Sequence, residues 1–283
     1  MKFFLLGLLL IDVACATPNT AALRQSLTKA TRNIQPEARI IGGEPATKSS
    51  RTSYLISLSI SAIAYAHVCA GAIIGKEWVL TAAHCLEELK ESATDVIGLP
   101  VYAGLQDRSD IENAQIRTID FAFAHKQFNA SQEGSPDIAL LHVTPGFEFG
   151  ADVNAVILPY RNEDYANKTS VTYGWGLTRR DAEQYAKQLQ VGSAQVLSET
   201  QCREQLPEDT PLGSNQICAE TLACFGDGGS PLVHETLGGT ELVGITSWGY
   251  TPCGSKGSPT VYTEVSRFIK WISDVQWAYY VLN

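Results

Sequence analysis

Three things are scarce in this 283-residue sequence, and each shortage excludes a class of protein. Beyond its first residues there is no apolar run near the ~18 residues that a membrane-spanning helix needs, so no helical anchor is expected. There is no CxxC pair, which argues against a structural zinc site. Positive charge is also scarce. The net charge is −9, and because residues 17–39 carry +3 and the preceding residues carry zero, residues 40–283 carry −12. Such an acidic body disfavours nucleic acid or an anionic membrane as a partner.

The start of the sequence has the pattern of a secretory signal peptide. Lys2 supplies a positive charge, Phe3 to Ile11 form a short apolar run, and Ala14-Cys15-Ala16 places small residues at the cleavage position. We therefore predict a signal peptide over residues 1–16 and a secreted, extracellular protein.

Two further segments follow the predicted signal peptide. Residues 17–39 are polar and basic, which is typical of an exposed pro-segment. From residue 40 the sequence changes to short apolar runs separated by Gly, Pro, Asn and Ser, and we expect residues 40–283 to form one domain.

The periodicity of this domain is mostly that of strands. Residues 56–60 alternate apolar and polar side chains, which predicts a half-buried strand. The runs on either side of residues 75–77 predict a hairpin, and residues 241–249 predict another strand. Only residues 265–275 repeat apolar side chains at helical spacing. Many short strands and one terminal helix indicate an all-β barrel or sandwich.

The cysteines favour disulfide bonds. Of the seven, Cys15 falls in the predicted signal peptide, and an even number remains for an oxidising secretory route. Their spacing alone does not select one pairing among the alternatives. The remaining cysteines are Cys69, Cys85, Cys202, Cys218, Cys224 and Cys253.

Several short motifs stand at wide intervals along the chain. They are RIIGG (39–43), TAAHC (81–85), DIALL (137–141), YGWG (173–176), CFGDGGSPL (224–232) and SWG (247–249). Together, in this order, they resemble the trypsin-like (chymotrypsin-like) serine protease family over about residues 39–275. The resemblance implies an all-β fold of two packed antiparallel six-stranded β-barrels with a C-terminal α-helix. It also implies the disulfides Cys69–Cys85, Cys202–Cys218 and Cys224–Cys253.

The resemblance assigns most of a catalytic site. A histidine takes the proton of a serine hydroxyl, a buried aspartate orients the histidine, and two backbone N–H groups hold the oxyanion. His84 matches the general base and Asp137 its orienting carboxylate, while Gly226 and Gly228 match the oxyanion donors. No cofactor or metal is expected; Leu105 stands where a calcium-binding relative would place a carboxylate.

The nucleophile position departs from the family pattern. Between Cys224 and Pro231 the spacing is that of the family, yet the residue after Asp227 is Gly228 instead of serine. Ser230 stands two residues later, roughly 6–7 Å away in an extended chain, whereas a base must lie about 3 Å from its nucleophile. We therefore predict a non-catalytic protease homologue that binds extracellular proteins or peptides, as a regulator or cofactor in an immune, clotting-like or reproductive pathway. The alternative is a weak endopeptidase that uses Ser230; a lectin-like protein has no supporting feature.

The specificity pocket also departs from the family. Its base matches Leu222, and its walls match Gly249 and Thr260, where relatives usually carry two glycines. We expect the threonine to narrow or fill the pocket.

The activation site is better preserved. Cleavage after Arg39, by a trypsin-like protease, would free the ammonium of Ile40 to pair with Asp227. The alternative is a site that is never cut.

Two N-x-S/T tripeptides predict glycosylation. They begin at Asn129 and Asn167, in segments expected to be loops of a secreted chain.

Overall fold

The computed structural model describes most of the predicted domain. The described residues are 43–47, 50–61, 64–92, 95–179, 182–220, 223–251, 253 and 258–282. The predicted signal peptide, the pro-segment with Arg39, the new N-terminus at Ile40 and the pocket residue Leu222 lie outside the described residues.

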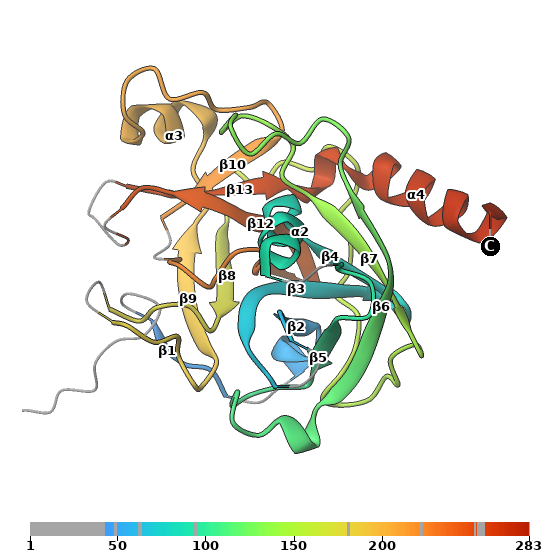
Figure 1. Ribbon diagram of the computed structural model, residues 1–283. Helices are drawn as coiled ribbons and strands as arrows, with labels where there is room; N and C mark the ends of the chain where they lie inside the picture. Colours follow the sequence, from blue (N-terminus) through green and yellow to red (C-terminus); the bar gives the residue numbers. More distant parts are fainter. Residues whose placement is uncertain are drawn as a thin grey trace, which may run out of the picture. The chain divides into compact units, whose positions relative to one another are not determined.

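The first sheet is a closed barrel with strand order β2-β3-β4-β7-β6-β5 (Figure 1). All neighbouring strands pair antiparallel. Its strands are β2 (Leu55–Ser59), β3 (His67–Gly75), β4 (Trp78–Thr81), β5 (Pro100–Ala103), β6 (Gln115–Ala124) and β7 (Ala139–Thr144). This sheet is the six-stranded barrel that the resemblance implies.

The second sheet has seven strands in the order β1-β9-β8-β11-β12-β13-β10 and does not close. The prediction of a second six-stranded barrel is therefore wrong in strand number and in closure. Its strands are β1 (Glu44–Pro45), β8 (Thr169–Gly174), β9 (Gln190–Gln195), β10 (Gln216–Ala219), β11 (Pro231–Thr236), β12 (Gly239–Gly249) and β13 (Thr260–Glu264).

A single isolated bridge spans the gap in the second sheet. Val196, just beyond β9, bridges to Ala219 at the end of β10. The chain then turns away into α3 (Glu199–Gln205), where Ser198 and Gln201 form a capping box that fixes the start of the helix. Two backbone hydrogen bonds accompany this bridge, from Leu197 to Cys218 and from Glu220 to Gln195, but no regular ladder between β9 and β10 is formed.

The strand and helix predictions can be compared with these elements. The hairpin is β3–β4, and the strand at 241–249 is the greater part of β12. β2 is a strand, but it is buried along its whole length instead of half-buried, since Ser57 has no exposed surface and hydrogen-bonds Tyr65 and His67. The terminal helix is present, after a 3-10 turn at Val265–Arg267.

Two helices were not predicted from the sequence, α2 (Ala83–Ser92) and α3. α2 follows β4 directly and buries Leu86 and Leu89 in the hydrophobic core. Both helices are shorter than α4 (Ile269–Leu282) and so offer fewer apolar repeats to a sequence-based prediction. None of the helices in the described residues has the length and apolar character to cross a membrane.

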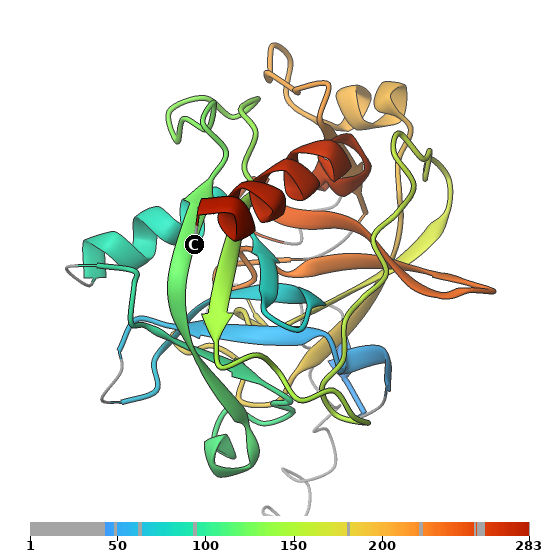
Figure 2. The same ribbon diagram turned by 90° about the vertical axis from the view of Figure 1, so that its right-hand side faces the viewer.

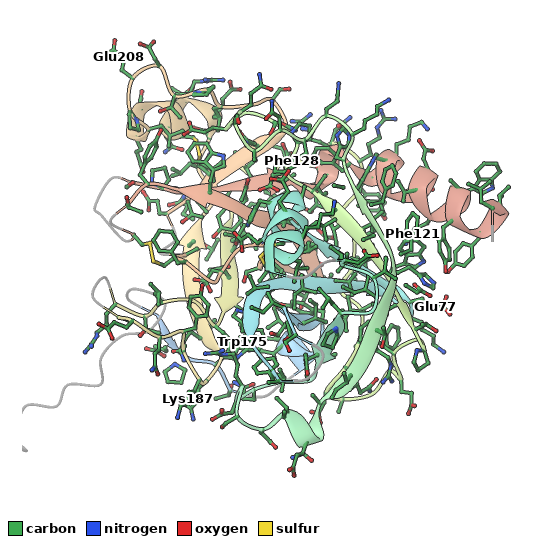
Figure 3. The ribbon with its side chains drawn as sticks, viewed as in Figure 1. Glu77, Phe121, Phe128, Trp175, Lys187 and Glu208 are labelled. Carbon is green, nitrogen blue, oxygen red and sulfur yellow. A yellow bond between two sulfur atoms is a disulfide. The ribbon has the colours of Figure 1, made fainter. Side chains whose placement is uncertain are left out.

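α4 lies along β6 and β7 of the barrel (Figures 1 and 2). Tyr279 stacks on His142 of β7 with ring centroids 4.2 Å apart, and it also contacts Phe121 of β6. The hydroxyl of Tyr280 accepts a hydrogen bond from Trp78 and donates one to Glu77. Figure 3 shows Glu77 and Phe121 on this side of the barrel.

Candidate active site

His84 and Asp137 come from two connections of the barrel. His84 lies in the first turn of α2, directly after β4, and Asp137 lies just before β7. Because β4 and β7 are paired neighbours, the residue that follows one strand and the residue that precedes the other meet at the same end of the barrel. The sheet thus brings together two residues that are 53 positions apart.

Three hydrogen bonds hold the Asp137 carboxylate. His84 donates to it twice, from its backbone N–H at 2.9 Å and from Nδ1 at 2.6 Å. Ser247 of β12 donates its hydroxyl to the same carboxylate at 2.6 Å. Since Nδ1 carries the proton that faces the carboxylate, Nε2 of the neutral ring is free to act as a base toward the other side.

Charge coupling decides the protonation of this pair. Burial by itself would lower the pKa of His84, but the Asp137 carboxylate, with Glu88 and Glu87, outweighs burial and raises it. Burial likewise opposes ionisation of Asp137, yet the imidazole and the hydrogen bonds from His84 and Ser247 hold the pKa of this carboxyl below its usual value. The pair is therefore electrostatically suited to hold a proton on the imidazole.

The loop at 224–231 forms a tight turn. The N–H of Asp227 donates to the carbonyl of Cys224 at 2.9 Å, and Gly226 has a φ of +89°, which favours glycine. The Gly226 carbonyl accepts from His67 Nε2 at 2.9 Å, and the Gly228 carbonyl accepts from the N–H of Ala70 at 2.8 Å. Both peptide carbonyls are thus anchored to β3.

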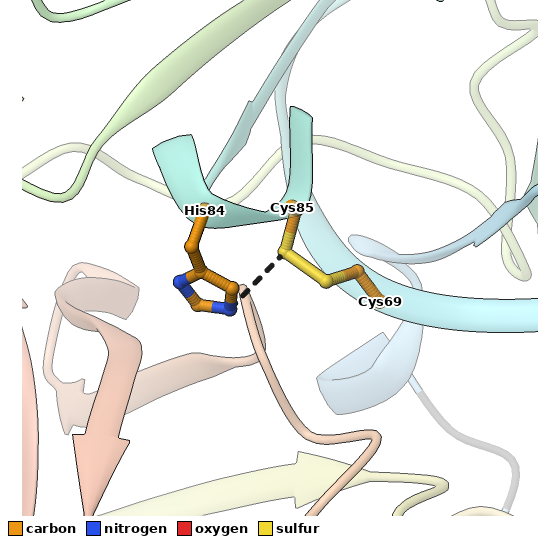
Figure 4. A group of neighbouring side chains, drawn as sticks. All are labelled: Cys69, His84 and Cys85. Carbon is orange, nitrogen blue, oxygen red and sulfur yellow. Dashed lines mark hydrogen bonds between the residues drawn. A yellow bond between two sulfur atoms is a disulfide. The ribbon is translucent and has the colours of Figure 1, made fainter. Parts of the chain in front are cut away.

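The imidazole of His84 occupies the space that a side chain at residue 228 would need. A Cβ on Gly228 would lie 2.5 Å from His84 Nε2 and 3.2 Å from Cys69 Sγ. Nε2 instead contacts Cys85 Sγ at 3.6 Å, beside the Cys69–Cys85 disulfide (Figure 4). The close group of two sulfurs and one imidazole is not a metal site, because disulfide sulfurs offer no thiolate.

Ser230 is not brought to His84. Its side chain has no exposed surface, and its Oγ has no hydrogen-bond partner within the described residues. The hydroxyl faces β8, since a Cβ on Gly174 would lie 3.1 Å from it.

Asp227 is a buried carboxylate that receives only backbone donors from the residues that the structure describes. It accepts the N–H of Gly176 at 2.8 Å and the N–H of Cys224 at 2.9 Å. No cation pairs with it among the described residues. Burial raises its pKa to about 6, partly offset by the two hydrogen bonds.

The described part of the chain contains three disulfides, and they are the pairs that the resemblance implies: Cys69–Cys85, Cys202–Cys218 and Cys224–Cys253. Comparison with known proteins adds the family. The family model described as Trypsin matches residues 40–272. The chain belongs to the trypsin family. It is similar to Lectizyme of Glossina austeni, with 35% identity over 256 residues that cover 84% of this chain and 87% of that protein.

In this trypsin-family chain, a hollow of about 270 Å³ lies beside the loop at 224–231. Its wall includes His84, Gly226 and Gly228, and also the predicted pocket residues Gly249 and Thr260. Thr260 is nearly buried and forms part of the wall, and the hollow is not filled by it.

A second hollow, of about 140 Å³, shares His84, Ser247 and Trp248 with the first. His84, Asp137 and Trp248 line it, together with Asn129 of the first predicted glycosylation tripeptide. Asn129 and Asn167 are both exposed and lie in loops, as expected for acceptors, and their modification stays a prediction.

The sequence analysis missed His67, although it lies only two residues before Cys69. His67 is buried between the ring edges of Trp175 and Tyr185, bonds Ser57 through Nδ1 at 2.7 Å and fixes the Gly226 carbonyl through Nε2. Burial lowers its pKa to about 4. No local pattern marks this histidine, because its partners lie 10 and 159 positions away.

Proposed function

We propose that this trypsin-family chain is a secreted protein that binds extracellular proteins or peptides in its cleft and does not hydrolyse them. One observation carries the proposal. The residue at the nucleophile position is Gly228, and the imidazole that would activate a nucleophile stands 2.5 Å from the point where the Cβ of such a residue would lie. Loss of the serine from a triad costs about 10⁶-fold in rate, or roughly 8 kcal/mol of transition-state stabilisation.

Secretion is supported by the pattern of residues 1–16 and by the three disulfides, since disulfides persist in oxidising compartments. The binding role is supported by the parts of the site that are present although the nucleophile is missing. The His84–Asp137 pair, the anchored turn at Gly226 and both hollows are all present without a nucleophile at residue 228.

A fluorophosphonate probe, which labels activated serines, tests the proposal. We expect no covalent labelling of the purified chain after cleavage at Arg39, and Ser230→Ala is the matched control. Labelling that disappears in Ser230→Ala would overturn the proposal and establish the alternative enzyme.

The variant Gly228→Ser tests the same point from the opposite direction. We expect weak labelling or none, because the new Cβ and the imidazole need the same space and the two hydrogen bonds to Asp137 restrain His84. Gly150→Ser is the control, since a Cβ on Gly150 meets nothing within 4 Å. Labelling of Gly228→Ser at the rate of an active trypsin would refute the argument from His84.

We further propose that cleavage after Arg39 regulates partner binding. Its support is Asp227, which is buried without a cation among the described residues and matches the position that would receive the ammonium of Ile40. N-terminal sequencing of the secreted protein should yield a chain that begins at Ile40. Recovery of only uncleaved chains would exclude this step.

A further inference from the structure

Three groups of the cleft that can donate an N–H lie close together, and two of them have no acceptor within the described residues. Within the described residues, the backbone N–H groups of Gly226 and Gly228 form no hydrogen bond. The third group is Nε2 of His84, which donates when the imidazole is protonated; it lies next to Gly228, and its contact within the protein is the long one to Cys85 Sγ at 3.6 Å. All three residues line the hollow of about 270 Å³.

The backbone segment that carries the N–H groups of Gly226 and Gly228 is fixed by hydrogen bonds to neighbouring residues. His67 holds the Gly226 carbonyl, Ala70 holds the Gly228 carbonyl, and Asp227 accepts the N–H of Cys224. A ligand that accepts from this loop therefore meets fixed donors and does not have to order them, which reduces the entropic cost of binding.

The protonated form of His84 carries a positive charge, which attracts an anion to the hollow beside Nε2. The pKa of the imidazole is raised, although burial opposes this, because Asp137, Glu88 and Glu87 surround it. An imidazolium donates from both nitrogens, so Nε2 becomes a charged donor while Nδ1 stays on Asp137. Hydrogen bonds between charged partners are roughly twice as strong as those between neutral ones.

A carboxylate matches this arrangement better than a peptide carbonyl does. One of its oxygens can accept from the backbone pair, and the second can accept from Nε2 of His84, since His84 lines the same hollow. An internal peptide bond offers a single carbonyl oxygen and a bulky continuation of the chain. Glu88, on the wall of the same hollow, and the nearby carboxylates of Glu87 and Asp137 oppose any anion and lower its affinity.

The other residues that line the hollow indicate what kind of side chain the carboxylate-bearing residue of the ligand can have. Ala223, Thr246, Gly249 and Thr260 line the hollow and carry no charge. The second hollow, which shares His84 with the first, is lined by Phe128 and other residues of the cleft and offers room for preceding residues.

We propose that the cleft is a binding site for the free C-terminal carboxylate of a peptide whose last residue has an uncharged side chain. The proposal rests on the proposed function, because a chain without turnover retains such a ligand. It gives the chain a specific kind of partner, namely a new chain end that a protease has produced.

N-acetyl-alanine and N-acetyl-alaninamide are matched probes, since they differ only in the terminal charge. Each is titrated into the secreted protein while the NMR signals of the His84 ring are followed. We expect a saturable shift with the acid and none with the amide. Equal shifts from both probes, or no saturable shift from the acid, would overturn the proposal.

Variants locate the carboxylate within the cleft. In Gly228→Ala the added methyl group competes with His84 Nε2 for space, and affinity for the acid should fall by about tenfold or more, the effect of losing one charged hydrogen bond. Gly150→Ala, whose methyl group meets nothing within 4 Å, should bind as the parent does. Glu88→Gln should bind more tightly, because it removes the opposing charge. Unchanged affinity in Gly228→Ala places the probe elsewhere and refutes the site.

The outcome is separable from that of the function itself. Fluorophosphonate labelling reports on turnover whether or not the acid binds. An unlabelled protein that fails to bind the acid therefore refutes only the carboxylate site.

Discussion

Asp227 and His67 are both fully buried near the same turn, but burial moves their pKa values in opposite directions. For Asp227 the pKa rises from an ordinary 3.8 to about 6, and for His67 it falls from 6.5 to about 4. In both residues burial disfavours the charged form, which is the anion for the acid and the cation for the base.

The two residues therefore change the free energy of unfolding with pH in opposite directions. As pH rises from about 4 to about 6, an unfolded Asp227 loses its proton before the folded one does, so its contribution to stability is lost. Over nearly the same range an unfolded His67 still holds a proton that the folded one has released, so its contribution is gained. Each effect amounts to about 3 kcal/mol, and in the uncleaved chain they nearly cancel.

Asp227→Asn should separate the two effects. We expect the free energy of unfolding of the wild type, minus that of Asp227→Asn, to fall by about 3 kcal/mol between pH 4 and pH 6.5. For His67→Gln the same difference should rise by a similar amount. Urea unfolding of the uncleaved chain at several pH values measures both, and parallel pH profiles of wild type and variants would contradict the assignment.

At the scale of elements, α4 is attached to the barrel by aromatic rings and by one chain of hydrogen bonds. Trp78 is buried in β4 and donates Nε1 to the Tyr280 hydroxyl at 3.0 Å, which in turn donates to Glu77 at 3.0 Å. Beyond these tyrosines the end of the helix is exposed, with Val281 58% exposed. The attachment of the last turn thus depends on the rings of Tyr279 and Tyr280 and on this chain of hydrogen bonds.

Tyr280→Phe should destabilise the protein by about 1 kcal/mol, because it leaves the N–H of a buried indole without an acceptor. Val281→Ala, one position further and exposed, is the control and should change stability by less than about 0.5 kcal/mol. Thermal unfolding of both variants provides the measurement. Equal effects would mean that the hydrogen bond contributes nothing to the docking of α4.

At the scale of the whole molecule, the site depends on contact between the barrel and the second sheet. Ser247 of β12 donates to the carboxylate of Asp137, and Thr263 of β13 donates to its carbonyl at 2.7 Å. Ala70 of β3 donates to the carbonyl of Gly228. One hydrophobic cluster also includes side chains of both sheets, among them Leu80 and Ile245.

Ser247→Ala should therefore cost about 2 kcal/mol, the value of a hydrogen bond to a buried charged group. Ser109→Ala removes a bond of the same kind and length, from Ser109 to Asp107 at 2.6 Å, but on the surface. We expect that control to cost less than about 0.5 kcal/mol, because exposed pairs compete with water. Urea unfolding midpoints of the two variants and the wild type measure these losses. Equal losses of stability in both variants would refute the coupling between the sheets.

Local chemistry made much of this molecule predictable. Regular alternation and turn residues located the hairpin β3–β4 and the strand β12, and helical spacing located α4. Sequence motifs identified His84 and Asp137, and the barrel places Nδ1 of His84 2.6 Å from the Asp137 carboxylate. The glycine at the nucleophile position could be identified from the sequence alone, because the spacing between Cys224 and Pro231 fixes which residue occupies that position.

Long-range packing decided the rest. No local pattern shows that β2 is buried on both faces, that the second sheet stays open, or that His67 holds the turn at Gly226, since each depends on partners far along the chain. The sequence by itself determined that a serine is missing. Only the tertiary structure placed the imidazole of His84 in the vacated space, because the approach of α2 to the loop at 224–231 follows from the packing of two sheets.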